Sequence, residues 1–138
     1  MKLESLCVQD IMSHDTFHVY PTTRIDDCAE QLARHKLSGA PVTDQYDHVI
    51  GFVSEQDLLE PLSQAVYYCH QPKNVESVMR SNVLTVTPTM QVMQIAKLMM
   101  EDKPKIFPVV EEGRLVGVIT RRLVTQALLQ AQKQCVPV

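Results

Sequence analysis

The sequence predicts an α+β fold made of two pseudo-symmetric β-α-β-β-α repeats that pack together through their sheets. The first observation is an internal repeat: Met12 and Met79 are 67 positions apart, as are Pro41 and Pro108. The second is that each copy shows one amphipathic helical stripe followed by two short apolar strands. A long period that occurs only twice favours a paired structure over a solenoid array.

The composition agrees with two small repeats that share one compact module. The chain has 138 residues, of which 45% are hydrophobic, and it has no Trp. One repeat alone is too small to bury its faces well, so the two are expected to stack. We expect the first repeat over residues 1–70, a linker over 71–74 and the second repeat over 75–138.

The first repeat is expected to open with a helical turn at 8–12 and a short strand over 14–20. A helix follows, because apolar residues recur there at i, i+3, i+4, i+7 and i+8. These residues are Ile25, Cys28, Ala29, Leu32 and Ala33. Thr22 or Thr23 could cap the start of this helix, and Gly39 is expected to stop it.

Two strands and a second helix complete the first repeat. A strand over 40–42 and a turn over 44–47 lead to a strand over 49–53, whose apolar run suits burial on both faces. A helix over 55–69 then carries an apolar side. Its members are Leu58, Leu59, Leu62, Ala65, Val66 and Cys69.

The second repeat is expected to keep this order. It reads as a strand over 83–86, a helix with an apolar stripe over 92–100, strands over 106–110 and 115–120, and a helix over 121–134. The matching order of elements is what makes the two copies pseudo-symmetric.

Each repeat also carries a motif at the junction between its last strand and its last helix. The first copy is Gly51-Phe52-Val53-Ser54-Glu55-Gln56-Asp57, and the second runs from Gly117 to Leu123. A hydroxyl and backbone N–H groups at a helix N-terminus can hold a phosphate. A carboxylate one turn along could accept hydrogen bonds from two ribose hydroxyls. The competing interpretation is a helix cap, with Ser at the N-cap and Asp at N3, and the motif alone favours it.

The order of these features resembles a tandem pair of CBS domains, the cystathionine-β-synthase type regulatory module. The features are the doubled Val-x-x-x-Met, the Pro before each first helix, the hydrophobic-Pro-Val strands and Gly-x-hydrophobic-Ser/Thr-x-x-Asp. The resemblance covers about Val8 to Leu129, and the chain resembles the stand-alone, Bateman-type pairs found in bacteria. It implies a regulatory, energy-sensing homodimer that signals to an effector protein.

The resemblance implies an adenosine-containing ligand in the cleft between the two copies: AMP, ADP, ATP, S-adenosylmethionine or a dinucleotide, with no obligatory cofactor. Ser54 would contact phosphate and Asp57 the ribose hydroxyls. Gly39 and Ala40 would line the adenine, with no side chain at Gly39 to crowd it. The facing wall is expected from the first loop of the other copy, at Ser81, Asn82 and Val83. With the repeat counted, we favour a nucleotide site over a bare helix cap.

The second copy of the motif departs from the family pattern. Thr120 keeps the hydroxyl, but Leu123 stands where the ribose-binding Asp would be and would leave a buried ribose unsatisfied. Nearby basic residues could pair with phosphates, or they could be solvated charges at helix ends. They are Lys103, Lys105, Arg121 and Arg122. We expect one competent site and a second that is empty or binds a ligand without a ribose contact.

Other functional classes find little support in the sequence. His14 and His18 have no third metal ligand in view, so a surface role is favoured over a metal site. The four cysteines are widely spaced, which indicates reduced thiols in a cytoplasmic protein. Residues 1–6 lack the apolar run of a signal peptide, and no apolar stretch could span a membrane. No nucleophile triad, P-loop or zinc spacing is present, so we expect no enzyme.

A docking module without a ligand is the alternative function. Ser54 and Asp57 would then be only a helix cap, and Leu123 favours this interpretation because one site is already lost. Both hypotheses predict a homodimer. The resemblance implies association through the helices, and the apolar stripes over 58–69 and 123–131 are long enough for this. A regulator that binds DNA directly ranks third, since the net charge is −3 and no helix-turn-helix pattern appears.

Overall fold

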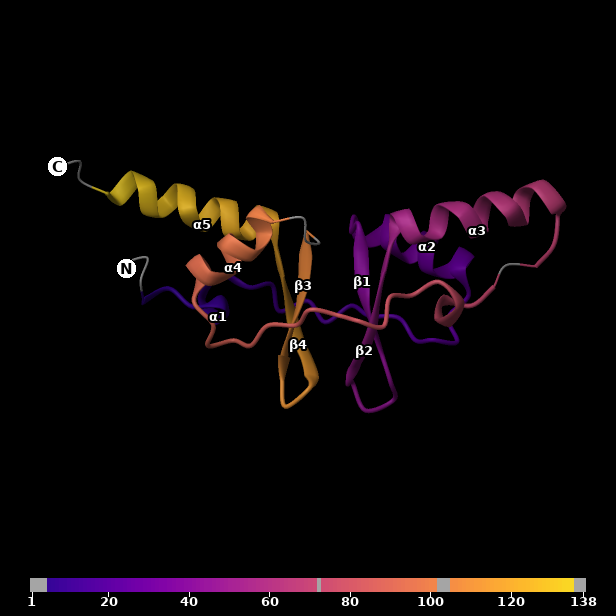
Figure 1. The fold of residues 1–138 in the computed structure, drawn as a ribbon, viewed down its shortest axis with the longest axis horizontal. Helices are drawn as coiled ribbons and strands as arrows, with labels where there is room; N and C mark the ends of the chain where they lie inside the picture. The colour runs from indigo at the N-terminus through magenta and orange to yellow at the C-terminus, as the bar shows by residue number, and fades with distance from the viewer. Residues whose placement is uncertain (1–4, 72, 102–104, 136–138) are drawn as a thin grey trace. The chain divides into compact units, whose positions relative to one another are not determined.

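The computed structural model describes residues 5–71, 73–101 and 105–135, and it confirms the α+β class with two small antiparallel sheets. Figure 1 shows the elements in chain order. They are α1 (Val8–Ile11), α2 (Ile25–His35), β1 (Gly39–Thr43), β2 (Val49–Ser54), α3 (Glu55–Tyr68), the 3-10 turn η2 (Val75–Ser77), α4 (Val92–Met100), β3 (Ile106–Glu111), β4 (Arg114–Thr120) and α5 (Arg121–Gln134).

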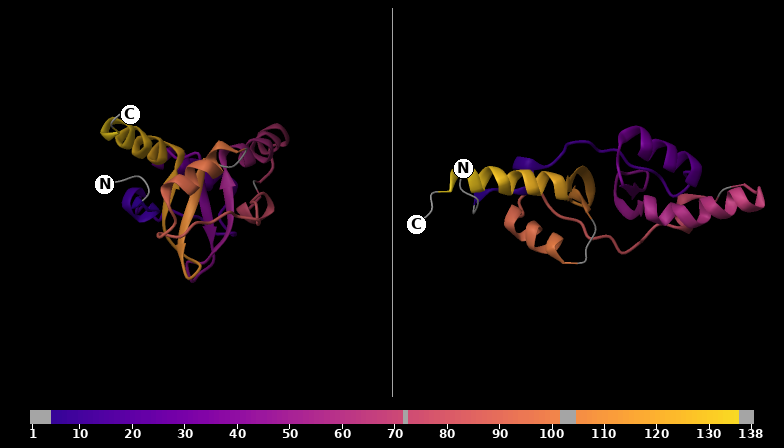
Figure 2. Two further views of the ribbon diagram at one scale, coloured as in Figure 1. Left: turned by 60° about the vertical axis from the view of Figure 1, so that its left-hand side comes forward. Right: turned by 90° about the horizontal axis from the view of Figure 1, so that it is seen from above.

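The chain folds into two compact units that exchange segments of the two sequence repeats. Unit 1 comprises residues 1–16 and 84–138, and unit 2 comprises residues 17–83. In unit 1, α4 and α5 pack together beside the β3–β4 hairpin (Figure 2). In unit 2, α2 and α3 pack in the same way with the β1–β2 hairpin. The start of each sequence repeat therefore belongs to the unit that carries the hairpin of the other repeat.

Backbone hydrogen bonds join each exchanged segment to the hairpin of the other repeat. In unit 1, Ser13 N–H donates to the Val118 carbonyl at 2.9 Å, and Val118 N–H donates back to Ser13 at 3.0 Å. In unit 2, Phe52 and Arg80 exchange the same pair of bonds at 2.9 and 2.8 Å. Each bond pair satisfies backbone groups of β4 or β2 that would otherwise lack a partner.

Glycines in β2 and β4 allow these segments to approach. A Cβ atom built on Gly117 would overlap the Ser13 carbonyl oxygen and the Met12 side chain. A Cβ atom on Gly51 would lie 2.8 Å from Met79 Sδ. The repeated Met and the repeated Gly are thus partners, because the Met of each sequence repeat packs on the Gly of the other.

Gly117→Ala is expected to lower the free energy of unfolding by about 1–3 kcal/mol, as other overpacking substitutions do. The obstacle is backbone, which cannot rotate away. Gly51→Ala is the matched control with a smaller expected loss, since its shortest contact is a flexible Met side chain. Urea denaturation measures both variants, and a Gly117→Ala protein as stable as the wild type would contradict the contact.

The predicted first strands over 14–20 and 83–86 are wrong in extent. Each is reduced to a single parallel bridge, Val19 with Val42 and Val86 with Val109. Val19 N–H donates to Pro41 at 3.1 Å, and Thr43 N–H donates to Val19 at 3.0 Å. Two bonds to one residue align the segment with β1 without building a longer ladder.

The predicted boundaries of the first long helix are also corrected. Arg24 is the N-cap of α2 and makes no side-chain cap bond. The Thr23 hydroxyl instead accepts the Tyr20 N–H at 3.0 Å, so it stabilises the preceding turn. Lys36, in the left-handed conformation with φ 56°, ends the helix, and Gly39 is the first residue of β1.

Each unit has its own aliphatic core. In unit 1 the buried residues are Val8, Met12, Val86, Val92, Ile95, Ala96, Met99, Phe107, Val109, Ile119 and Val124. In unit 2 they are Val19, Ile25, Cys28, Leu32, Ala40, Val42, Val53, Leu58 and Val75. The cores anchor β2 and β4, and so fix the start of the helix that follows each strand.

The prediction that the strand β2 is buried on both faces was wrong. Gly51 and Val53 are buried, whereas Ile50 is exposed, because an antiparallel hairpin with one covered face alternates its side chains.

The apolar side predicted for α3 is only partly covered. Leu58 is buried, but Leu59 and Val66 are 69% and 81% exposed.

Candidate functional site

Ser54 and Asp57 lie at the junction of β2 and α3 and are bound to each other. Ser54 Oγ accepts the Asp57 N–H at 3.3 Å. Asp57 Oδ2 accepts the Ser54 N–H and the Ser54 hydroxyl, both at 2.9 Å. This is the capping box that the sequence offered as the competing interpretation, and it holds the hydroxyl and the carboxylate together at the start of a 14-residue helix.

Arg80 is a further member of the site that the sequence analysis missed. Its Nε donates to Asp57 Oδ1 at 3.3 Å, and the Asp57 side chain is only 12% exposed while that of Arg80 is 61% exposed. The backbone bonds with Phe52 hold Arg80 in place. Asp57 is thus a shielded carboxylate with one charged, solvent-facing partner.

The repeat contained a signal for this pair. Arg80 corresponds to Ser13, 67 positions earlier, and Asp57 corresponds to Leu123, 66 positions later. Both members of the ion pair are therefore present in unit 2, and both positions are uncharged in unit 1. Comparison of matched positions for opposite charges would have pointed to Arg80.

Gly39 and Ala40 lie beside this junction, in the strand that pairs with β2. Gly39 is opposite Ser54 and Ala40 is opposite Val53 in the β1–β2 register, and both are buried. A Cβ atom on Gly39 would lie 2.7 Å from the Phe52 ring. Close packing of the Phe52 ring on Gly39 is therefore what requires glycine at this position.

Ser81, Asn82 and Val83 follow Arg80 directly and belong to the same unit as Ser54. Ser81 and Asn82 are exposed, and Val83 is half-buried. The polar side chains of Ser81 and Asn82 are therefore accessible to solvent.

The second copy of the motif forms a simpler cap. Thr120 is the N-cap of α5, and its hydroxyl accepts the Leu123 N–H at 3.2 Å. Leu123 is half-buried and supplies no acceptor, while Arg121 is exposed and donates its backbone N–H to Lys105 at 2.9 Å. Lys103 lies outside the described residues.

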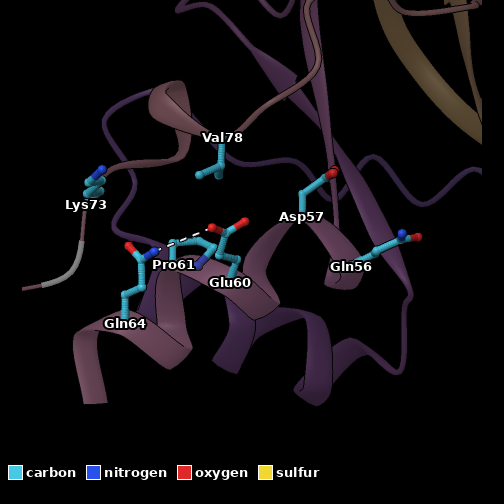
Figure 3. A pocket seen from close by; sticks show the side chains of 7 residues that line it. All are labelled: Gln56, Asp57, Glu60, Pro61, Gln64, Lys73 and Val78. Atoms are coloured by element: carbon cyan, nitrogen blue, oxygen red, sulfur yellow. Dashed lines mark hydrogen bonds between the residues drawn. The ribbon is translucent and has the colours of Figure 1, made fainter. Parts of the chain in front are cut away.

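A cavity of about 400 Å³ opens beside Asp57 in unit 2. Figure 3 shows it between α3 and the segment that carries Lys73 and Val78. The lining residues are Gln56, Asp57, Glu60, Pro61, Gln64, Lys73 and Val78. The lining thus includes two acidic residues of α3 and one Lys of the opposite segment, a polar lining that suits a molecule with hydroxyl groups.

Other side-chain chemistry is sparse in the described part of the chain. No group of three or more His, Cys, Asp or Glu residues there could hold a metal ion. Burial raises the pKa of the Cys28 thiol to about 11, so this thiol stays protonated and unreactive at neutral pH. Among the same residues, no helix has the length and apolarity that a membrane span requires.

Comparison with known proteins identifies the family. The sequence model of the CBS domain matches residues 8–64 and again residues 75–130. The chain belongs to the CBS domain family. It is a tandem CBS pair, because the two matches together cover most of its length.

Solved structures of CBS pairs share this fold. The chain is 32% identical to the crystallised CBSX2 of Arabidopsis thaliana in complex with AMP, with a TM-score of 0.79 over 92% of this chain and 98% of that one. It is 25% identical to a putative acetoin utilization protein, AcuB, from Vibrio cholerae, also with a TM-score of 0.79, over 96% of this chain and 98% of that one.

Several curated relatives are longer than this CBS pair. The chloroplastic CBSX1 of Arabidopsis thaliana is 30% identical over 86% of this chain and 61% of its own length. The uncharacterized protein MJ1225 of Methanocaldococcus jannaschii is 26% identical over 82% of this chain and 39% of its own length. The chain is 28% identical to an A-adding tRNA nucleotidyltransferase from Aquifex aeolicus over 92% of this chain, and it spans only 15% of that protein's length.

Proposed function

We propose that this CBS pair is a regulatory module that binds an adenosine-containing ligand at Ser54 and Asp57 of unit 2. The observation that carries the proposal is the likeness to CBSX2, a protein crystallised with AMP, at 32% identity over nearly the whole of both chains. The shielded Asp57 carboxylate would accept from ribose hydroxyls, and the Ser54 hydroxyl, which donates to Asp57, would turn from it to a phosphate.

The local chemistry gives each group a role. The Ser54 hydroxyl and the N-terminus of α3 would hold a phosphate, which the helix dipole favours. The ribose hydroxyls would donate to the Asp57 carboxylate and compete with Arg80 for Oδ1, which Arg80 reaches at a relatively long 3.3 Å. The released guanidinium would be free to pair with phosphate, for which its planar fork is suited. Gly39, Ala40 and the 81–83 segment would flank the adenine.

The second motif differs from the first because Leu123 stands in α5 where Asp57 stands in α3. Thr120 and Arg121 could contact a phosphate, but the first turn of α5 has no acidic residue that could accept from ribose hydroxyls. We therefore expect one adenosine ligand per chain.

The ligand would act by shifting a conformational equilibrium. It must bind one arrangement of the module more tightly than another to have any effect on a partner. We propose a homodimer that signals to an effector protein, with a regulatory and not a catalytic role, in the cytoplasm.

A docking module without a ligand is the second candidate. The capping box favours it, because Ser54 and Asp57 already satisfy each other's hydrogen bonds. Calorimetric titration of nucleotide-free protein with AMP, ADP, ATP and S-adenosylmethionine separates the two functions. Saturable binding near one ligand per chain is the expected result, and absence of heat with all four ligands would favour the docking module.

A further inference from the structure

Arg80 is fixed beside Asp57 by its main chain, while its side chain is held only loosely. The Arg80 N–H donates to the Phe52 carbonyl at 2.8 Å, and the Phe52 N–H donates back at 2.9 Å. The Arg80 side chain is 61% exposed and donates to Asp57 Oδ1 from Nε at 3.3 Å. The guanidinium can therefore change its partner by side-chain rotation, while the backbone keeps it beside the carboxylate.

The Arg80–Asp57 ion pair lacks the two-pronged geometry that makes arginine–carboxylate pairs strong. In the Arg24–Asp26 pair of the same unit, Nε and Nη2 both donate to the carboxylate, at 3.1 and 2.8 Å. Arg80 donates from Nε and at a longer distance. Because two parallel bonds add strength and direction to such a contact, the Arg80 contact is the easier of the two to exchange.

The Asp57 carboxylate has little free capacity for ribose hydroxyls while Arg80 is bound. An ionised carboxylate offers about four acceptor sites. Three are taken, because Oδ2 accepts the Ser54 N–H and hydroxyl and Oδ1 accepts Arg80 Nε. Two neighbouring ribose hydroxyls need two sites. Either the Ser54 hydroxyl or the Arg80 guanidinium must therefore leave Asp57 before both can bind.

A phosphate bound at Ser54 would need a cation close to it. Ser54 Oγ is 2.9 Å from Asp57 Oδ2, so this phosphate would lie beside a carboxylate, and Glu55 adds a second acidic residue in the first turn of α3. The helix dipole supplies only about half a positive charge, which does not balance the two acidic residues. Arg80 already contacts the carboxylate, and a guanidinium is well suited to phosphate.

We propose that Arg80 is a specificity-determining residue that makes this site select adenosine ligands with a 5′-phosphate over adenosine and S-adenosylmethionine. In the free protein the guanidinium occupies an acceptor that the ribose needs. A phosphate would draw both Arg80 and the Ser54 hydroxyl away from Asp57 and so free the carboxylate for the ribose. Adenosine has no phosphate to attract Arg80, and S-adenosylmethionine brings a positive sulfonium group, which Arg80 repels. The proposal rests on the adenosine site of the proposed function and names the ligand class for it.

The other repeat lacks both partners of this contact. Ser13 stands where Arg80 would be, and Leu123 stands where Asp57 would be. Ser13 makes the equivalent pair of backbone bonds with Val118, so serine fits this backbone position and Arg80→Ser is expected to fold. A purely structural ion pair would produce the same pattern of residues, so the ligand preference has to separate the two roles.

Calorimetric titration of Arg80→Ser with AMP and with adenosine tests the proposal. AMP affinity is expected to fall about 10-fold, the scale of one lost hydrogen bond between charged groups. Adenosine affinity is expected to rise about threefold, the scale of one exposed ion pair, because Arg80 no longer competes for Asp57. The preference for AMP over adenosine should therefore fall about 30-fold.

Arg34→Ser is the matched control. Arg34 also makes an exposed ion pair in unit 2, with Glu30 at 3.4 Å, but it lies on α2. This variant loses the same charge and should leave both affinities unchanged. Arg80→Lys keeps the charge without the planar fork, so its AMP affinity should fall by less than that of Arg80→Ser. Circular dichroism verifies that each variant is folded.

An unchanged preference in Arg80→Ser, with both affinities shifted equally, would overturn the proposal and leave Arg80 as a structural ion pair. The Arg80 Nε–H resonance of isotope-labelled wild-type protein gives a test without a variant. AMP is expected to shift this resonance, and a resonance that stays in place at saturating AMP would also overturn the proposal. A wild-type protein that binds no AMP would refute the adenosine site itself, and the proposal with it. The wild-type titration therefore reveals that failure, and the variant reveals a failure of the Arg80 proposal alone.

Discussion

Phe107→Ala is expected to lower the free energy of unfolding by about 3–5 kcal/mol, the usual cost of deleting a buried aromatic ring. Phe107 lies in β3, is fully buried, and belongs to the core of unit 1 with Val8 and Ile119. Its loss removes apolar contact and leaves a cavity that the surrounding strands cannot fill. Urea denaturation followed by circular dichroism measures the change.

Phe52→Ala is the matched control for this prediction. Phe52 is only half-buried, and its ring covers Gly39 in unit 2. The same deletion should therefore cost less than it does at Phe107. Equal losses in the two variants, or a loss at Phe107 below about 1 kcal/mol, would contradict the assigned core.

Asp57→Ala is expected to weaken AMP binding about 10- to 150-fold, because hydrogen bonds to a charged group are worth roughly 1.5–3 kcal/mol. The variant removes the shielded acceptor that the ribose hydroxyls would use. It also removes half of the capping box, so its free energy of unfolding should fall by about 0.5–2 kcal/mol. Calorimetry must therefore be done where the variant is shown to be folded.

Leu123→Ala is the control for the site assignment. Leu123 holds the same position in α5 as Asp57 holds in α3, and it offers no acceptor. The substitution is expected to leave AMP affinity unchanged. Unchanged affinity in a folded Asp57→Ala protein, or an equal loss in Leu123→Ala, would refute the role given to Asp57.

Local sequence patterns predicted the helices well where the bounds of an element depend only on residues nearby in the sequence. The helix predicted over 121–134 has the observed bounds of α5, and the predicted α4 stripe begins and ends at Val92 and Met100, as the helix does. The predictions failed at boundaries where one distant contact decides the structure. The extent of the 14–20 segment depends on Val42, which no local periodicity reveals.

The exchange of segments between the repeats could not be derived from either repeat alone. Ser13 pairs with Val118, more than a hundred positions away, and the pairing depends on the missing side chain of Gly117. The doubled Met and Gly were visible as a repeat, but that they touch each other across copies follows only from the three-dimensional fold.

Only part of the candidate site was visible in the sequence, because some of its contacts join residues that are far apart along the chain. Ser54 and Asp57 stood out because their spacing on a strand-to-helix junction is local. Arg80 was missed because it lies in a loop without periodicity, 23 positions from Asp57. The role of Gly39 toward adenine stays a prediction, and the close contact with the Phe52 ring was not visible in the sequence.

The measurement that tests the central claim most directly is an AMP titration of isotope-labelled, nucleotide-free protein followed by amide NMR spectra. Binding at unit 2 predicts that the largest shifts occur at Gly39, Ser54, Asp57 and the 80–83 segment, while the amides of Thr120 and Leu123 stay in place. Shifts centred on Thr120, or spectra unchanged by AMP, would contradict the claim that Ser54 and Asp57 form the adenosine site.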